Sequence, residues 1–187
     1  NSLMVSRHTI RSAIANLNML GILETRQGDG NYVRETGIGL YIDFLIPYLM
    51  INTANVSQII EFREAIEISV ARRATEENLE DIRQKLEACN SSRHNTTAYP
   101  AVDLEFHCAI ARASKNDLLI QSMNVIKQYC FQAISSYFTE DLAEAGADCH
   151  QKLFEALCAH NEDEAALYMS RHMANIISRI PQNDPAE

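Results

Sequence analysis

The sequence predicts a mainly α-helical protein in which a short helix and a β-hairpin precede an all-helical bundle of seven helices. Two observations predict the bundle. Beyond residue 39, apolar residues recur at three- and four-residue spacings, and the runs are separated by breaks that contain helix-capping residues. A third observation concerns the front of the chain, where the alternating pattern of strands occupies residues 22–35.

The first predicted helix begins at Arg7, where Ser6 can cap it, and ends at Gly21, which suits a left-handed backbone conformation. His8 and Arg11 lie on its polar faces. Its apolar residues form a single stripe: Ile10, Ala13, Ile14, Leu17 and Leu20.

Two short strands follow, with the sequences "ILETR" and "NYVRE". The turn between them reads "QGDG", in which Gly28 and Gly30 can adopt positive φ. A helix with basic and amide side chains near its start suits the major groove of DNA, and a hairpin flanked by arginines suits the neighbouring backbone. The alternative is a packing unit that carries surface arginines.

The stretch "VSRHTIRSAIANLNMLGILETRQGDGNYV" closely resembles the recognition helix and wing of GntR-family winged-helix transcription regulators. Thr9 and Ser12 depart from the family pattern, but neither position supplies its main DNA contacts. The resemblance implies that the residues contacting operator DNA are Ser6, Arg7, Arg11, Gly28 and Gly30.

The family places two helices before this segment, so we expect the chain to begin inside a truncated winged helix-turn-helix domain. We assign residues 1–36 to this partial DNA-binding domain, 37–181 to the helical bundle and 182–187 to a flexible tail. The helices predicted for the bundle are about 40–52, 56–76, 78–90, 99–114, 117–138, 140–160 and 162–180.

The charge is unevenly distributed along the chain. The whole sequence has a net charge of −9, but residues 1–36 contain four basic and three acidic residues. DNA could therefore bind at the front of an otherwise acidic protein. No apolar run reaches the ~18–20 residues of a membrane span. The five cysteines include no pair with two-residue spacing, which favours reduced thiols in a cytoplasmic protein.

Three histidines and one aspartate have a spacing that suits a metal. Asp103 and His107 lie four residues apart, on one face of a predicted helix. His150 and His172 each lie about ten residues from the "HNED" break, so an antiparallel helix pair would put them at the same height. Three imidazoles and one carboxylate suit Zn²⁺, with Ni²⁺ and Mn²⁺ as alternatives. The alternative is an ordinary Asp–His ion pair with unrelated histidines; His8, His94 and His160 have no comparable geometry.

Residues 56–176 resemble the FCD type of ligand-binding domain found in the FadR subfamily of GntR regulators. The matching motifs are "EFREAIE", "DLEFH", "HQKLFEAL" and a further histidine one helix later. The resemblance implies a metal held by Asp103, His107, His150 and His172.

The resemblance also implies an effector pocket at Arg63, whose guanidinium matches a carboxylate. Without the resemblance, a surface ion pair between Arg63 and Glu67 would be favoured. Asn116 could add a polar contact. We expect a small carboxylate effector, such as a hydroxy acid, a sugar acid or a dicarboxylate, that changes the operator binding of a homodimer.

Two other functions are open at this point. One is a regulator whose metal is purely structural. The other is a metal-dependent hydrolase, in which the metal activates water. No motif ties a general base to the four residues, and Glu105 lies on another helix face from Asp103. We therefore expect a regulator rather than an enzyme.

Overall fold

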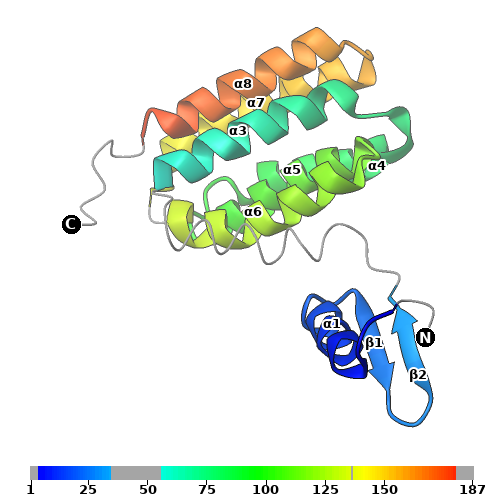
Figure 1. The fold of residues 1–187 in the computed structure, drawn as a ribbon. Coiled ribbons are helices and arrows are strands. Elements are labelled where there is room, and N and C mark those ends of the chain that lie inside the picture. The colour runs from blue at the N-terminus through cyan, green and yellow to red at the C-terminus, as the bar shows by residue number, and fades with distance from the viewer. Residues whose placement is uncertain (1–3, 35–55, 136, 180–187) are drawn as a thin grey trace.

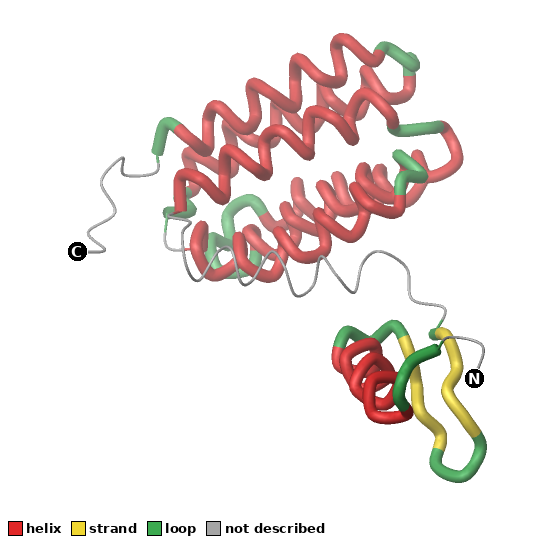
Figure 2. The backbone as a smooth tube through the Cα atoms, in the orientation of Figure 1, coloured by secondary structure: helices red, strands yellow, loops and turns green. Residues whose placement is uncertain are grey.

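The computed structural model describes residues 4–34, 56–135 and 137–179. In these ranges the chain is mainly helical, and the strands belong to one hairpin (Figure 2). The helix predicted at 40–52 and the tail at 182–187 lie outside the described residues. No helix in the described part of the chain is both long and apolar enough to cross a bilayer.

The helix and hairpin predicted at the front are confirmed. Helix α1 (Arg7–Met19) precedes the antiparallel strands β1 (Leu23–Arg26) and β2 (Gly30–Val33). Ser6 caps the helix by accepting a hydrogen bond from the backbone N–H of Thr9 at 3.1 Å. That this helix and hairpin are part of a truncated winged helix-turn-helix domain stays a prediction.

Two glycines allow the turns of this unit. Gly21 ends the helix with φ at +70°, and Gly28 in the hairpin turn has φ at +79°, a conformation that favours glycine. Gly30 also has a positive φ, at +158°, as its place in the turn predicted. Helix and hairpin are joined by side chains, since the Asn18 amide donates to the Thr25 hydroxyl at 2.6 Å.

Six of the seven predicted bundle helices are confirmed, with ends shifted by a few residues. A short 3₁₀ turn, η1 (Glu76–Asn78), occupies the junction between the predicted segments 56–76 and 78–90. The observed helices are α3 (Val56–Arg73), α4 (Leu79–Ser92), α5 (Tyr99–Ala113), α6 (Asp117–Ser135), α7 (Glu140–Cys158) and α8 (Glu162–Ile177).

Figure 1 shows α3, α7 and α8 side by side on one side of the bundle, with α4, α5 and α6 on the other. Helix α5 is central, since eleven of its 15 residues are buried and it packs against α3, α4 and α6. Helices α7 and α8 form an antiparallel hairpin whose members begin at side-chain caps, Thr139 and Asn161. This arrangement directs side chains of α3, α5, α7 and α8 into a common part of the core.

Candidate metal and effector site

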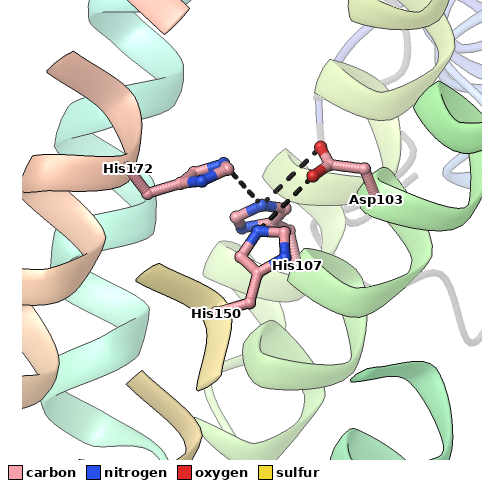
Figure 3. Close-up of side chains that lie close together, drawn as sticks. All are labelled: Asp103, His107, His150 and His172. Carbon is pink, nitrogen blue, oxygen red and sulfur yellow. Dashed lines mark hydrogen bonds and ion pairs between the residues drawn. The ribbon is translucent and has the colours of Figure 1, made fainter. Parts of the chain in front are cut away.

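Four side chains from three helices meet in the core of the bundle (Figure 3). Asp103 and His107 come from α5, His150 from α7 and His172 from α8. Each offers a carboxylate oxygen or an imidazole nitrogen, and these atoms lie within 4.8 Å of one another. All four residues are at most 2% exposed. The structure therefore brings the four predicted residues together, while metal binding itself stays a prediction.

The local fold explains why these four side chains lie close together. Asp103 and His107 are one turn apart on α5, so they face the same side. The α7–α8 hairpin puts His150 and His172 level, with ring centroids 4.4 Å apart. Phe106, also buried, packs against His150 with the centroids 4.5 Å apart. Phe106 thus forms an apolar side of the polar cluster.

The Nε2 atoms of His107 and His150 lie near the Asp103 carboxylate, and Nε2 of His172 lies near that of His107. Nε2 of His107 lies 3.1 Å from Nε2 of His172 and 3.7 Å from Oδ2 of Asp103. Nε2 of His150 lies 3.4 Å from Oδ1 of Asp103. Ligand atoms ~2.0–2.1 Å from one ion are separated by roughly 3.0–3.4 Å when adjacent, so the spacing fits a shared divalent ion.

Glu67 of α3 fixes the orientation of His107. Its Oε2 contacts Nδ1 of His107, while its Oε1 accepts a hydrogen bond from Nε of Arg63. An ionised carboxylate only accepts hydrogen bonds, so Nδ1 of His107 carries the proton. Once its Nε2 is deprotonated, His107 presents a lone pair on that atom to the cluster centre. A carboxylate behind a histidine is the usual support of a metal-binding imidazole.

The electrostatic balance differs among the histidines. Burial lowers the pKa of His150 to about 4, against the attraction of Asp103, so this imidazole is neutral near pH 7. Burial and the neighbouring His150 lower the pKa of His172 well below its ordinary value. For His107, burial acts in the same direction, but attraction by Glu67 and Asp103 outweighs it and raises the pKa.

For the carboxylates of Asp103 and Glu67, burial and attraction shift the pKa in the opposite directions. Burial alone would raise the pKa of Asp103, but the attraction of His107 and His150 holds it well below the ordinary value. Burial likewise works against ionisation of Glu67, yet Arg63 and His107 lower its pKa. The cluster therefore holds two ionised carboxylates in the core.

Several buried polar atoms of the cluster lack a hydrogen-bond partner among the described residues. They include both carboxylate oxygens of Asp103, both ring nitrogens of His150 and Nδ1 of His172. Buried polar atoms are normally paired, so such a concentration indicates that something else satisfies them. A divalent ion fits this requirement, because it takes carboxylate oxygen and imidazole nitrogen together.

Arg63 lies beside the cluster and is fully buried, so the surface ion pair considered from sequence is wrong in its location. Its partner is nevertheless Glu67, as that alternative supposed. Nη2 of Arg63 lies 3.6 Å from Oδ2 of Asp103 and has no hydrogen-bond partner in the described part of the chain. Burial opposes its charge, but Glu67 and Asp103 raise its pKa above the ordinary value. Arg63 therefore carries a positive charge with one unsatisfied nitrogen toward the cluster.

The structure does not bring Asn116 to this cluster. Asn116 is exposed, and its side-chain oxygen accepts hydrogen bonds from the backbone N–H groups of Leu118 and Leu119 at 3.1 and 3.2 Å. These bonds cap the start of α6, which is a common role for asparagine. Asn116 is therefore left out of the pocket we describe.

Sequence reasoning missed Tyr99 and Gly146. Tyr99 is 1% exposed and lies one turn before Asp103, and its hydroxyl donates to the carbonyl of Ala143 at 3.4 Å. A Cβ atom on Gly146 would lie 3.4 Å from that hydroxyl and 3.6 Å from Cε1 of His172. A glycine inside a capped helix, one turn before His150, was the available clue, since glycine there disfavours helix.

His94 is less isolated than expected. Its Nδ1 contacts Glu140, and together with Glu144 they offer ligand atoms within 4.8 Å of one another. All three side chains are exposed, so water can satisfy them without an ion. The side chains of the buried cluster, by contrast, are not accessible to water.

Two surface clefts open elsewhere, around the loop between α3 and η1. One has a volume of about 250 Å³ and is lined by Thr75, His160 and Glu162 among others. The other is lined by Arg72 and Ser114, among others. No residue of the buried cluster lines either cleft. The cluster is therefore closed to solvent in this conformation.

The predicted DNA-contacting residues lie on the surface of the N-terminal unit. Arg7 and Arg11 are exposed on α1, Gly28 lies in the hairpin turn and Gly30 begins β2. The hydroxyl of Ser6 is engaged in capping α1. The positions agree with an accessible recognition helix and wing, while DNA binding by these residues stays a prediction.

Comparison with known proteins places residues 58–175 in the FCD domain family. Over 185 residues the chain is 28% identical to the HTH-type transcriptional regulator LutR of Bacillus subtilis, covering 94% of this chain and 84% of that protein. It is 29% identical over 193 residues to the putative L-lactate dehydrogenase operon regulatory protein of Escherichia coli, covering 96% and 74%.

The fold also matches solved structures. A Streptococcus agalactiae GntR structure superposes with a TM-score of 0.65 at 23% identity, covering 96% of this chain and 85% of that one. At this identity the match supports the fold. Among sequence relatives, the Uxu operon regulator of Haemophilus influenzae is 24% identical over 182 residues, covering 92% of this chain and 67% of that protein.

Proposed function

Because this chain belongs to the FCD-domain family and is a GntR-type transcription regulator rather than an enzyme, we propose that it is an acid-responsive, metal-binding member of the FadR subfamily. In this proposal the bundle holds a divalent metal and a small organic acid. The acid changes how strongly the N-terminal unit binds operator DNA. The protein acts in the cytoplasm as a homodimer.

The observation that carries the proposal is the buried cluster of Asp103, His107, His150 and His172. Their ligand atoms lie within 4.8 Å of one another, and several lack other partners in the described residues. We propose Zn²⁺ as the ion, with Ni²⁺ and Mn²⁺ as alternatives. When bound, the ion supplies a Lewis-acidic centre that can attract carboxylate oxygen.

The proposed effector class is supported by Arg63 and by the name of one relative. That relative is a putative L-lactate dehydrogenase operon regulatory protein. Nη2 of Arg63 has no hydrogen-bond partner among the described residues and lies 3.6 Å from Oδ2 of Asp103. It could therefore donate a hydrogen bond to an acid bound beside the metal. We propose a small hydroxy acid or related carboxylate.

Operator binding is assigned to Arg7, Arg11 and the Gly28–Gly30 wing. In a homodimer two recognition helices would read a palindrome at fixed half-site spacing. The acid can shift the population of dimer geometries only by binding one geometry more tightly than another. Helices α5, α7 and α8 share the proposed metal, so a change in their packing is the expected link.

The test has two parts. Elemental analysis of purified protein should find one divalent ion per chain, and His150→Ala with His172→Ala should remove it. A screen of organic acids on metal-loaded protein should then find a stabilising acid. Excess acid at a hundred times its dissociation constant should add ~2.7 kcal/mol of stability.

Arg63→Ala should keep the metal and lose most of this stabilisation, whereas Arg72→Ala should lose none. Arg72 lies on the same helix but is exposed, with its Nη1 2.6 Å from Asp163. Metal content that survives in the double histidine variant would contradict the metal site. Metal binding without a response to any acid would favour a purely structural ion.

A further inference from the structure

A relay of three side chains runs from α1 to the outer half of the hairpin. The amide nitrogen of Asn18 donates to the Thr25 hydroxyl at 2.6 Å, and that hydroxyl donates to Oδ1 of Asn31 at 2.6 Å. Asn18 lies in the last turn of α1, Thr25 on β1 and Asn31 on β2. One hydroxyl therefore links all three elements of the N-terminal unit, because a hydroxyl can accept one hydrogen bond and donate another.

The relay contacts the hairpin close to its turn. Thr25 and Asn31 lie directly opposite each other, and one further pair, Arg26 and Gly30, separates them from the turn. That glycine-containing turn is the part of the hairpin that we assign to operator DNA. The relay therefore joins α1 to the half of the hairpin that would approach the DNA.

The other end of the hairpin is held by the backbone. The N–H of Ile22, just before β1, donates to the carbonyl of Leu17 at 2.9 Å, and the N–H of Arg34, just after β2, donates to the carbonyl of Ile22 at 2.9 Å. The hairpin is thus attached to α1 at two places along its length. An attachment at the base alone would let the strands swing about it, whereas the second attachment opposes that movement.

Apolar packing contributes little to fixing this angle. None of the described residues 4–34 is buried, and Ile14 and Leu17 of α1 are only half-buried. A hairpin of two strands is marginally stable by itself and twists easily. The hydrogen bonds of the relay, which are directional, therefore matter more here than they would beside a packed core.

The outer face of the hairpin has separate contacts. The Arg26 guanidinium lies 4.6 Å from the ring centroid of Tyr32, and its Nε lies 3.3 Å from Oε1 of Glu24. Side chains alternate between the two faces of a strand, so these three residues face away from Thr25 and Asn31. The relay residues therefore occupy the side of the hairpin toward α1, which suits a role in positioning rather than in contacting DNA.

We propose that Asn18, Thr25 and Asn31 are positioning residues for operator binding, which hold the turn of the hairpin at one angle to α1. The inference rests on the proposed operator binding by α1 and the wing, and it adds residues that act through that site. Recognition helix and wing then reach the DNA already in the arrangement that binding requires. Preorganisation of this kind raises affinity by reducing the conformational entropy lost on binding.

The test uses Thr25→Val in the intact protein, since valine keeps the branched shape and the strand preference of threonine but has no hydroxyl. The probe is a duplex that the wild type selects from a random pool, compared at fixed salt with an unselected duplex of equal length. Affinity for the selected duplex should fall by roughly tenfold, because two hydrogen bonds no longer hold the wing. Affinity for the unselected duplex should change by less than about twofold, since it depends on charged contacts to phosphate that the variant keeps.

Further variants show whether the hydroxyl is responsible. Thr25→Ser keeps the hydroxyl and should restore most of the affinity for the selected duplex. Asn18→Ala breaks the same relay, so adding it to Thr25→Val should cost little more than Thr25→Val alone. Thr97→Val changes an exposed threonine between α4 and α5 in the same way and should bind as the wild type does.

A measurement without DNA tests the geometry directly. Residual dipolar couplings of the backbone amides in α1 and in the hairpin should fit a single alignment in the wild type and in Thr25→Ser. In Thr25→Val the helix and the hairpin should need alignments of different size, because the hairpin then moves relative to α1. Loss of the couplings expected for either element would instead show that the unit had unfolded.

The outcomes separate the two levels of reasoning. Wild-type affinity of Thr25→Val for the selected duplex would overturn the positioning role, and the proposed operator binding would stand. An equal loss for both duplexes, no rescue by Thr25→Ser, or an unfolded unit would also overturn it, because each indicates a general structural effect. Failure of the wild type to select any duplex would reject the proposed operator binding, and this inference with it.

Discussion

Replacing Glu67 with glutamine should destabilise the metal-free chain by about 3 kcal/mol and weaken Zn²⁺ binding by a factor of roughly 10 to 100. Glu67 is fully buried and bridges Arg63 and His107, which belong to different helices. Glutamine has the same shape but no charge. The substitution therefore tests the electrostatic role of the side chain with little change in packing.

The magnitude follows from these contacts. Removing one partner of a buried ion pair costs ~3–5 kcal/mol, because the remaining charge stays desolvated. The amide oxygen of glutamine can still accept one of the two hydrogen bonds, which favours the lower end of that range. The amide nitrogen then faces a second donor, either Nε of Arg63 or Nδ1 of His107. In the second case the imidazole loses its orientation, and metal affinity falls.

The measurement at neutral pH captures the whole effect. Burial raises the pKa of Glu67, but attraction by Arg63 and His107 outweighs it, and the folded-state pKa lies below the ordinary value. A carboxylate with a lowered folded-state pKa stabilises the fold above its unfolded-state pKa. That contribution is lost as the pH falls through the lowered pKa. The difference between wild type and Glu67→Gln should accordingly shrink in strong acid.

Urea unfolding of chelator-treated protein gives the stability, and competition with a chromophoric chelator gives the Zn²⁺ affinity. The control is Glu61→Gln, an exposed position on α3, which should stay within about 0.5 kcal/mol of wild type. The reasoning is refuted if Glu67→Gln loses less than about 1 kcal/mol with an unchanged denaturant slope.

Three further predictions concern the metal and the DNA. In Gly146→Ala, the new Cβ would make ordinary contacts of 3.4 Å with the Tyr99 hydroxyl and 3.6 Å with Cε1 of His172, so the metal-free chain should gain up to ~1 kcal/mol of helix propensity and keep its metal affinity; a roughly tenfold loss of affinity by chelator competition would contradict this. Chelation should lower the melting temperature of wild type by several degrees but not that of His150→Ala with His172→Ala, as measured by calorimetry. In the intact protein, Arg7→Ala with Arg11→Ala should lose operator specificity by ~1–3 kcal/mol per lost guanine contact; an unchanged operator affinity of this double variant at fixed salt would contradict the recognition-helix assignment.

The helices could be predicted because their signals are local. Apolar spacing located six bundle helices, and Thr139 and Asn161 cap α7 and α8 at breaks identified from sequence. Helix ends were less certain, as at α6, which was expected to reach residue 138 and ends at Ser135. The short η1 turn depends on the path between two packed helices, which the local pattern does not specify.

The meeting of the four candidate ligands could also be predicted from periodicity. Asp103 and His107 needed only the helical repeat, and His150 and His172 needed only equal distances from one break. The two pairs were joined by family resemblance, because no local rule says which face of α5 meets the α7–α8 hairpin. The structure joins them at 3.4 Å, between Nε2 of His150 and Oδ1 of Asp103.

Other site features require the tertiary structure. Glu67 was predicted as a partner of Arg63, but its contact with His107 links α3 to α5 and has no sequence spacing. Asn116 was given a pocket role although it lies in a break suited to helix capping, and capping is what it does. The capping bonds are observed, and an effector contact by Asn116 stays a prediction.

The cost of this cluster is itself an argument for its role. The core of the bundle contains an arginine, two carboxylates and three imidazoles, all at most 2% exposed. Apolar residues of similar volume would usually stabilise a core as well or better, so a purely packing role does not explain these groups. A divalent ion would satisfy the unpaired atoms of Asp103, His150 and His172. The arrangement that destabilises the metal-free fold would then be what holds the ion, with the Arg63 guanidinium beside it as the positively charged partner for a carboxylate.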